Sequence, residues 1–467
     1  MNLRVLAADA MALPVLSEQR RESVLMAVNV LTRVAFGVLI VLSPFRARFE
    51  LASRPDLPVY RDYTDFLLYW SDIAFLVFLG LWGLGLIVGG RRPWLGPAVI
   101  RWSVIGLLLA VWASVPLSVD ASLSVYNALR LTGAAVLALY VANEVRLEQL
   151  APALIVMIGL QAVVGVSQAI DQGSVGLYGL GEYHLDVNAG GTSVVWSDVG
   201  PRQLRVYGLS DHPNILGGLL AMSLLLLGAA AARARNEWTV LLGVVFAVGC
   251  AALVLTFSRA AALSMALGLV LVFGLLAYRR SWRSLASWAA VCVGAAILCL
   301  TLIKPYGPYL SIRSGLLESG PASSTEQRSI SEREALAKNA NEIFVVHPLL
   351  GVGAGALPSA MLDAYPDFGY NYQPAHFALL TVAAETGLLG GMFYGALMIA
   401  PFALLWWRRR ELTPELIAVS GALLAMTIIG LFDYYTWSLA PGRIWFWLVL
   451  GLWVSAYARR SGAAADA

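Results

Sequence analysis

Charged residues are scarce in this chain. They make up 13% of the 467 residues, whereas hydrophobic residues make up 59%. Soluble domains average about 25% charged and about 45–50% apolar residues, and a membrane-spanning helix needs about 20 apolar residues. The composition therefore excludes an ordinary soluble enzyme. It predicts an all-α polytopic membrane protein with about a dozen spans.

Lysine and cysteine are also rare. Lys304 and Lys338 are the only lysines, so nearly all of the 32 basic residues are arginine, and the net charge is only +3. The basic residues are spread over many loops, which argues against a nucleic-acid partner. The three cysteines all fall in apolar runs, so neither a disulfide framework nor a zinc site is supported. The first apolar run lacks a small-residue cleavage site and is interpreted as a retained span.

Apolar runs bounded by charged residues predict the membrane spans and their orientation. The twelve predicted spans are 24–44, 73–89, 102–118, 127–143, 150–170, 214–232, 238–257, 260–278, 286–303, 377–405, 416–432 and 443–457. Most arginines fall in alternate short loops, and cytoplasmic loops are enriched in Lys and Arg. We therefore expect both termini to be cytoplasmic.

This orientation divides the chain into segments. The predicted segments are a cytoplasmic arm (1–23), spans one to nine (24–303) with an outer loop at 171–213, a large outer loop (304–376), spans ten to twelve (377–457) and a cytoplasmic tail (458–467). Loops as long as the two outer ones are uncommon unless they are functional or disordered.

The second long outer loop has internal order. Ser331 and Glu334 form a capping box that predicts an amphipathic helix over 332–346, ended by Pro348. This helix could lie on the membrane face or pack on the bundle. The glycine-rich stretch 351–355 superficially resembles a phosphate loop, but no strand precedes it, so we expect a flexible turn.

Histidine is scarce, and its placement is informative. All four histidines, His184, His212, His347 and His376, fall on the predicted outer side. Histidine is the side chain best suited to proton transfer near neutral pH. The chain has no D-x-D sequence for a metal-bound nucleotide sugar and no Walker A loop. An activated donor on the outer face would have to be carried by a lipid.

Outer arginines suit a lipid diphosphate. Guanidinium groups hold phosphate oxygens bidentately and stay charged, so two or three could neutralise a departing diphosphate without a metal ion. Arg259 lies in a very short outer turn, against the positive-inside trend. Snorkelling to the lipid headgroups is the alternative explanation for this residue.

Four motifs occur in order along the outer face. They are R-x-x-G-x-x-x-x-P-N from Arg205 to Asn214, S-R-A at 258–260, R-(x)14-P-L-L-G-V-G-x-G from Arg333 to Gly355, and His376 followed by E-x-G-L-L-G at 385–390. Together they resemble the O-antigen ligase and O-antigen polymerase superfamily. The resemblance spans about 205–390, and the twelve-helix count agrees over the rest of the chain.

The resemblance implies a metal-independent, inverting glycosyltransferase of the GT-C type that needs no cofactor. It would transfer a glycan from undecaprenyl diphosphate to an acceptor hydroxyl, on a lipid or a glycan, at the periplasmic or external face of the bacterial inner membrane. By motif match, Arg205 and Arg259 would bind the diphosphate, and Arg333 would be a further phosphate contact. His376 would act as base or orient the acceptor. The family often has Asn after this histidine, where this chain has Phe377.

Other polar residues are interpreted as supporting ones. Asp211, His212, Asn214 and Glu385 are the possible supporting residues. His212 either caps the following span or lines the donor site. His347, beside a helix-ending proline, favours a structural role.

Ionisable residues inside spans should face the bundle interior and find partners. Arg33, Arg130 and Glu385 are such residues, and an ion pair between Glu385 and Arg130 is expected.

Three functions remain open besides ligation of a glycan to lipid A core or a similar surface acceptor. A polymerase would use the same donor chemistry. A flippase could use Glu385 with Arg33 or Arg130 as a coupling relay, although acidic residues near the midplane are almost absent and no matching broken helices occur in two halves. A peptidoglycan-type glycosyltransferase would need an outer carboxylate, and Asp211 is the one expected beside the site.

Overall fold

The computed structural model describes residues 18–54, 57–196, 201–234, 237–313 and 320–460. This part of the chain is predominantly helical and carries only two short two-stranded sheets. Within it, eleven helices are long and apolar enough to cross a membrane. The predicted class, an all-α polytopic membrane protein, is confirmed.

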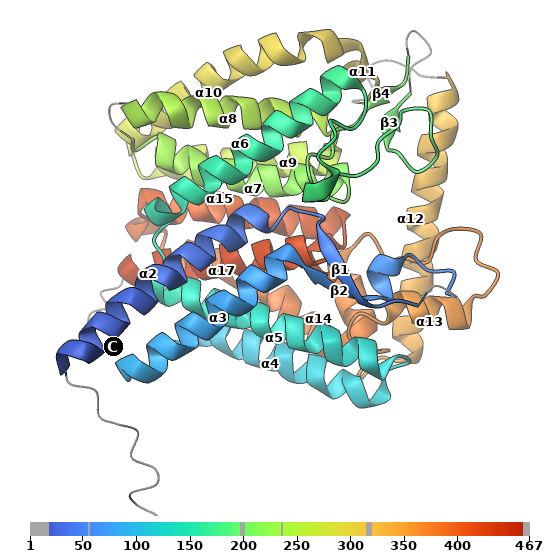
Figure 1. Ribbon diagram of the computed structural model, residues 1–467, viewed down its shortest axis with the longest axis horizontal. Coiled ribbons are helices and arrows are strands. Elements are labelled where there is room, and N and C mark those ends of the chain that lie inside the picture. Colours follow the sequence, from blue (N-terminus) through green and yellow to red (C-terminus); the bar gives the residue numbers. More distant parts are fainter. Residues whose placement is uncertain (1–17, 55–56, 197–200, 235–236, 314–319, 461–467) are drawn as a thin grey trace, which may run out of the picture.

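In the described part of the chain, the bundle (Figure 1) consists of twelve long helices. They are α2 (Glu18–Leu42), α3 (Trp70–Gly89), α4 (Ala98–Ser114), α5 (Ala121–Glu144), α6 (Leu147–Asp171), α7 (Pro213–Ala231), α8 (Glu237–Leu255), α9 (Arg259–Tyr278), α10 (Trp282–Ile303), α14 (Ala378–Trp407), α15 (Pro414–Phe432) and α17 (Ala440–Arg460).

The last predicted span, 443–457, corresponds to α17, which is not among the eleven apolar helices. Its sequence includes Arg443 and several tryptophans, which lower its mean hydropathy. Trp445, Trp447 and Trp453 are fully buried, and α17 packs against α5 and α15. This helix lies inside the bundle, where a polar side chain can be satisfied by protein rather than lipid.

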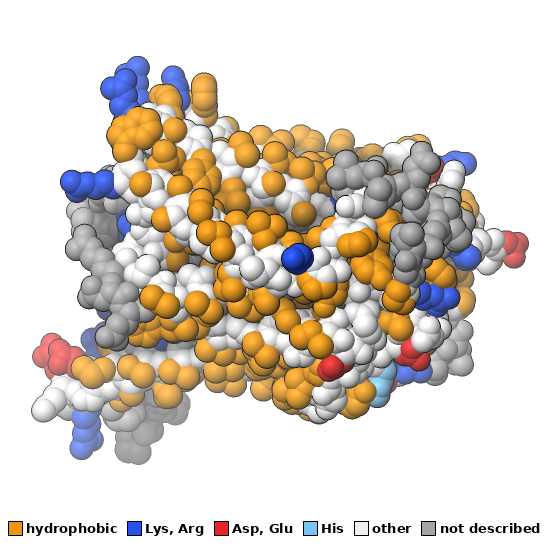
Figure 2. Space-filling view, turned by 90° about the horizontal axis from the view of Figure 1, so that it is seen from above, with side chains coloured by type: hydrophobic (Ala, Val, Ile, Leu, Met, Phe, Trp, Pro, Cys, Tyr) orange, Lys and Arg blue, Asp and Glu red, His pale blue; other side chains and the backbone are white. Residues whose placement is uncertain are grey.

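The two ends of the bundle differ. The start of α2 and the end of α17 lie at the same end of the bundle, which we call the terminal end (Figure 1). The opposite end, the loop end, carries all the strands and the short helices α11 (Gly307–Arg313), α13 (Leu357–Ala364) and α16 (Tyr435–Ser438). On the face seen in Figure 2, apolar side chains cover the middle and charged ones gather toward the ends, as expected of a membrane-embedded surface.

Short strands order the loop end. β1 (Arg48–Ala52) pairs antiparallel with β2 (Phe66–Tyr69), and β3 (Val194–Val195) pairs with β4 (Gln203–Leu204). The β1–β2 hairpin lies between the first two spans, and the sequence patterns did not predict it. The hairpin is short: β1 alternates polar and apolar residues only from Arg48 to Leu51, and β2 has no alternation.

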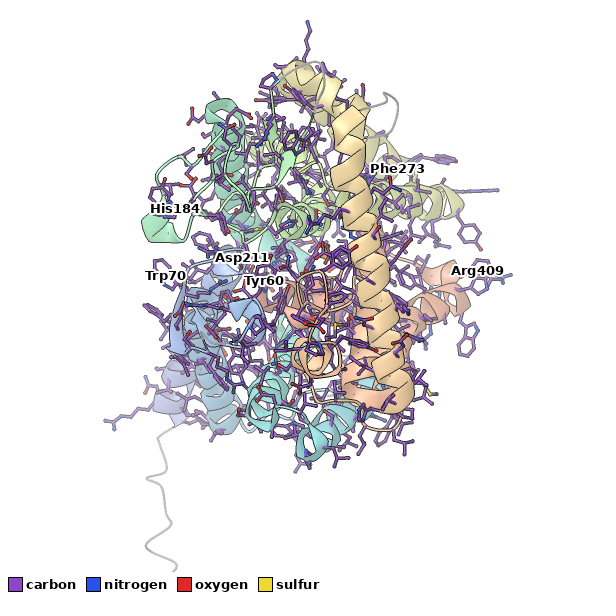
Figure 3. All side chains as sticks on the ribbon, turned by 90° about the vertical axis from the view of Figure 1, so that its right-hand side faces the viewer. Tyr60, Trp70, His184, Asp211, Phe273 and Arg409 are labelled. Atoms are coloured by element: carbon purple, nitrogen blue, oxygen red, sulfur yellow. The ribbon has the colours of Figure 1, made fainter. Side chains whose placement is uncertain are left out.

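Helix α12 (Gly320–Val346) runs across the loop end, roughly at right angles to the bundle helices (Figures 1 and 3). The predicted start at residue 332 is wrong, because Ser331 lies inside the helix. A capping box is a local signal, and after Pro321 the preceding residues contain neither glycine nor proline to end a helix. The predicted end before Pro348 agrees with the structure. Leu336, Ala340 and Ile343 are buried, so the helix packs on the protein beneath it.

The glycine-rich stretch 351–355 is not a flexible turn. It docks into a break of α14 at Gly387, whose φ is 75°. Val352 N–H donates to Ala384 O (3.0 Å), Gly353 N–H donates to Glu385 O (2.9 Å), and Leu388 N–H donates to Pro348 O (2.8 Å). A Cβ on Gly387 would overlap the backbone carbonyl of Leu349. These motif glycines therefore permit a close crossing of two backbone segments.

Candidate functional site

The tight turn between α8 and α9 is a scaffold for two arginines. Phe257 has a φ of 49°, an uncommon left-handed conformation for an aromatic residue. The carbonyl of Thr256 accepts a hydrogen bond from Arg205 Nε (2.8 Å), and that of Phe257 accepts one from Arg313 Nε (3.2 Å). Arg259 is the first residue of α9, directly after the turn. The S-R-A motif thus forms the point where three arginines converge.

Arg205 is buried and fixed in place. Its Nη2 donates to Asn214 Oδ1 (2.6 Å). Burial and the charges of Arg313, Arg333 and Arg259 lower the pKa of Arg205 to about 9. The structure therefore brings together the three predicted arginines and a fourth, Arg313. We call Arg205, Arg259, Arg313 and Arg333 the site arginines.

His212 caps α7. Its Nδ1 accepts a hydrogen bond from Asn214 N–H (3.1 Å), so Nε2 carries the proton and donates to Ser193 Oγ (3.2 Å). Burial and the nearby charge of Arg205 lower its pKa to about 3. The capping interpretation is confirmed, and both ring nitrogens are occupied in holding the loop.

His376 lies just before α14, half-buried, with its ring against that of Tyr434 at a centroid distance of 4.9 Å. Burial lowers its pKa to about 4, with Asp433 acting to raise it and Arg333 to lower it. Its Nδ1 is buried and has no hydrogen-bond partner among the described residues. The ring is therefore neutral at pH 7 and able to accept a proton.

Asp433 links the two motif regions. It follows α15, is buried, and its Oδ2 accepts a hydrogen bond from Asn214 Nδ2 (3.3 Å). Asn214 thus connects Arg205 to the carboxylate of Asp433. The charge of this carboxylate also acts to raise the pKa of His376. Asp211 was expected to be the outer acid beside the site. The structure assigns that position to Asp433.

A tyrosine network surrounds the histidine. Tyr434 Oη donates a hydrogen bond to Gln373 Oε1 (3.0 Å). The Tyr63 hydroxyl lies 2.6 Å from Tyr434 Oη and donates a hydrogen bond to it. Gln373 Nε2 donates in turn to Glu332 Oε1 on α12 (3.0 Å). Burial and Asp433 raise the pKa of Tyr434, which stays a neutral phenol. Helix α12 is thereby tied to the segment that carries His376.

Asp211 belongs to a separate ionic cluster. It forms an ion pair with Arg46 (2.8 Å from Nε to Asp211 Oδ1) and accepts a hydrogen bond from Arg48 Nη1 (3.0 Å), and Arg48 also pairs with Asp62. We call Arg46, Arg48, Asp62 and Asp211 the hairpin cluster. Burial and Asp211 raise the pKa of Asp62 to about 6. Figure 3 shows Asp211 near Tyr60 at the loop end. Two arginines neutralise Asp211, which removes support for its use as a catalytic acid or base.

Glu385 does not pair with Arg130, so that prediction is wrong. Its Oε2 accepts from Trp437 Nε1 (2.7 Å) and Gly355 N–H (2.8 Å), which fastens the glycine-rich stretch to α14. Arg130 instead pairs with Asp72 (2.6 Å) on α3. Arg33 was expected to face the interior but is exposed. Spacing alone does not determine which faces of two distant helices meet.

The other two histidines, His184 and His347, also lie at the loop end. His184 is exposed and stacks on Tyr178 (4.1 Å between ring centroids). His347 is exposed at the end of α12.

Two residues of the site were missed by sequence reasoning, namely Arg313 and Asp433. Arg313 ends the segment that follows the ninth span, and Asp433 directly follows the eleventh. An ionisable residue at the outer end of a span was the available signal in both cases.

These features define a polytopic membrane protein with an arginine-rich site and a neutral histidine at one end of its bundle. Residues 242–395 match the family model described as O-antigen ligase. The resemblance to the O-antigen ligase and polymerase superfamily is thereby confirmed for this segment, which contains Arg259, Arg313, Arg333 and His376. Arg205 and Asp433 lie outside the matched residues. A comparison with curated proteins gave no match.

Proposed function

We propose that this protein transfers a glycan from undecaprenyl diphosphate to an acceptor hydroxyl at the loop end. The observation that carries the proposal is the convergence of four arginines there. The site arginines lie close enough for three of them to lower the pKa of the fourth, Arg205, which is joined to Asp433 through Asn214. The O-antigen ligase match supports an enzyme of this general type.

A diphosphate is the anion that such a site suits best. Guanidinium groups bind phosphate oxygens in a bidentate way, and an anion is attracted to a partly buried place where several cations converge. Fixed cations also stabilise the charge that develops on a departing diphosphate. Arginines would supply the neutralisation that a metal ion gives in other transferases, so we expect transfer to be metal-independent.

The proposed step is an inverting substitution. The acceptor oxygen attacks the anomeric carbon from the side opposite the diphosphate, and the bond from that carbon to the diphosphate oxygen breaks. The proton of the acceptor hydroxyl passes to neutral His376. The carboxylate of Asp433 and the negative diphosphate both favour the imidazolium as it forms.

The acceptor and location are part of the same proposal. We propose ligation to lipid A core or a similar surface acceptor, with polymerisation of lipid-linked repeats as the alternative. The chain would lie in the bacterial inner membrane with the loop end on the periplasmic or external side. The bias of arginines toward the terminal-end loops supports this orientation.

The test is product analysis with the purified full chain in proteoliposomes. A defined undecaprenyl-diphosphate glycan is supplied with each candidate acceptor, with and without a chelator. We expect a new glycosidic bond, release of undecaprenyl diphosphate, and no effect of the chelator. His376→Asn should slow transfer by about 10²–10⁴-fold. His347→Asn, the exposed control, should leave the rate unchanged.

Two results would separate the parts of the proposal. Transfer by His376→Asn at the parental rate would overturn the assignment of the base. Movement of the intact lipid-linked glycan across the bilayer, with no new glycosidic bond, would overturn the function in favour of a flippase.

A further inference from the structure

A groove at the terminal end is not used by the proposed function. Its volume is ≈ 580 Å³, within the range of small-molecule sites. It lies where the first turn of α4 meets the last turns of α14 and α17. The lining includes Trp94, Ala403, Leu404, Trp407, Arg408 and Tyr457. His376 lies at the other end of α14, so this groove is separate from the candidate site.

The lining has an apolar part and a positively charged part. The walls are mainly apolar, and the one charged residue among the lining residues is Arg408, whose guanidinium lies 5.1 Å from the centroid of the Tyr457 ring. The groove therefore complements an elongated apolar molecule that ends in an anionic group.

The surroundings place the groove at the membrane boundary. Trp406 and Trp407 are 66% and 80% exposed, and tryptophans concentrate at the lipid headgroup level. Leu404 and Ala400 lie about one and two helical turns farther into α14, toward the middle of the bundle. Apolar walls on the bilayer side and a cation on the headgroup side match the orientation of a lipid in one leaflet.

We propose that this groove binds one anionic phospholipid from the leaflet at the terminal end. Its acyl chain would lie along Ala403 and Leu404, and its headgroup would pair with Arg408. Basic pockets between membrane helices recognise anionic headgroups in this way. The bound lipid would join α4, α14 and α17, and so brace the helix that begins beside His376.

The test is native mass spectrometry of the full chain with phosphatidylglycerol or phosphatidylcholine. The parental protein should retain phosphatidylglycerol about five-fold better, because one arginine near a headgroup contributes about 1 kcal/mol. Arg408→Gln should lose this preference. Arg410→Gln, also exposed at this end but outside the groove, should keep it.

A second variant tests the apolar part of the groove. Ala403 is exposed and lines it, so Ala403→Trp should fill the space and reduce retention of both lipids. Thermal unfolding of each variant checks that it is folded. Equal retention of the two lipids by the parental protein would overturn the proposal. An unchanged preference for phosphatidylglycerol in Arg408→Gln, or unchanged retention of both lipids in Ala403→Trp, would also overturn it. Displacement of phosphatidylglycerol by inorganic phosphate alone would identify a free-phosphate site instead.

Discussion

Two groups of arginines lie at the loop end, and they differ in how their charge is balanced. In the hairpin cluster two arginines face two aspartates, whereas Arg205 lies near three other arginines and is joined to Asp433 through Asn214. Burial would lower the pKa of Arg48, yet Asp211, Tyr69 and Asp62 raise it above its ordinary value. For Arg205, burial and like charges lower the pKa to about 9. The hairpin cluster pairs its charges as ions of opposite sign, whereas like charges converge on Arg205, an arrangement that a bound anion would stabilise.

The largest effect should come from replacing one of the site arginines by an acid. Arg333→Glu reverses a charge that acts on Arg205, His212 and His376. We expect transfer to fall by about 10²–10³-fold, the loss typical of removing one group that stabilises transition-state charge. Initial rates in proteoliposomes measure it.

The matched control for that change is Arg61→Glu. Arg61 is 55% exposed at the loop end and pairs with Glu50. Transfer should continue at the parental rate in this variant. An equal loss in both variants would mean that general loop-end charge, rather than the site arginines, determines the rate.

A smaller effect, on stability rather than rate, is expected from the hairpin cluster. Asp211→Asn leaves Arg46 and Arg48 with Asp62 as their remaining partner in the cluster. Because these groups are partly exposed, we expect a loss of about 2 kcal/mol in the free energy of unfolding, less than for a fully buried pair. The transfer rate per folded molecule should not change. Lost transfer with unchanged stability would instead favour chemistry that uses Asp211.

The smallest expected effect is a shift of pH dependence. The pKa of His376 is about 4, so its ring is neutral at higher pH. The ring becomes protonated, and can no longer act as a base, only when the pH falls below this pKa. The value of kcat/KM should therefore be flat from pH 8 to 6 and decline with a midpoint near 4. Asp433→Asn removes a charge that favours the imidazolium and should move the midpoint lower. A parental midpoint near 6.5, the ordinary histidine value, would contradict the burial argument.

Sequence patterns predicted what depends on local composition and order. The apolar runs correspond to the bundle helices, and motif order placed Arg205, Arg259, Arg333 and His376 at one end before any contact was known. Asp433 was missed because its partner Asn214 lies 219 residues away, and a single aspartate forms no pattern.

The errors have the same physical origin. Glu385 and Arg130 are both inside helices, and the rule that intramembrane charges find partners holds for each. It does not say which partner. Glu385 meets Trp437, and Arg130 meets Asp72. Contacts between distant helices depend on how those helices rotate and cross, which a single sequence does not specify.

The break in α14 has a consequence for how the protein is assembled. Backbone groups left unpaired in hydrocarbon cost several kcal/mol each. At this break, the carbonyls of Ala384 and Glu385 are paired by N–H groups of the preceding loop. Helix α14 can therefore reach its final shape only after that loop has docked. Biogenesis must complete this docking before His376, at the start of α14, acquires a fixed position. A substitution such as Gly387→Ala would thus cause an assembly defect, visible as degraded or misinserted chain, in a protein whose reactive groups are all intact.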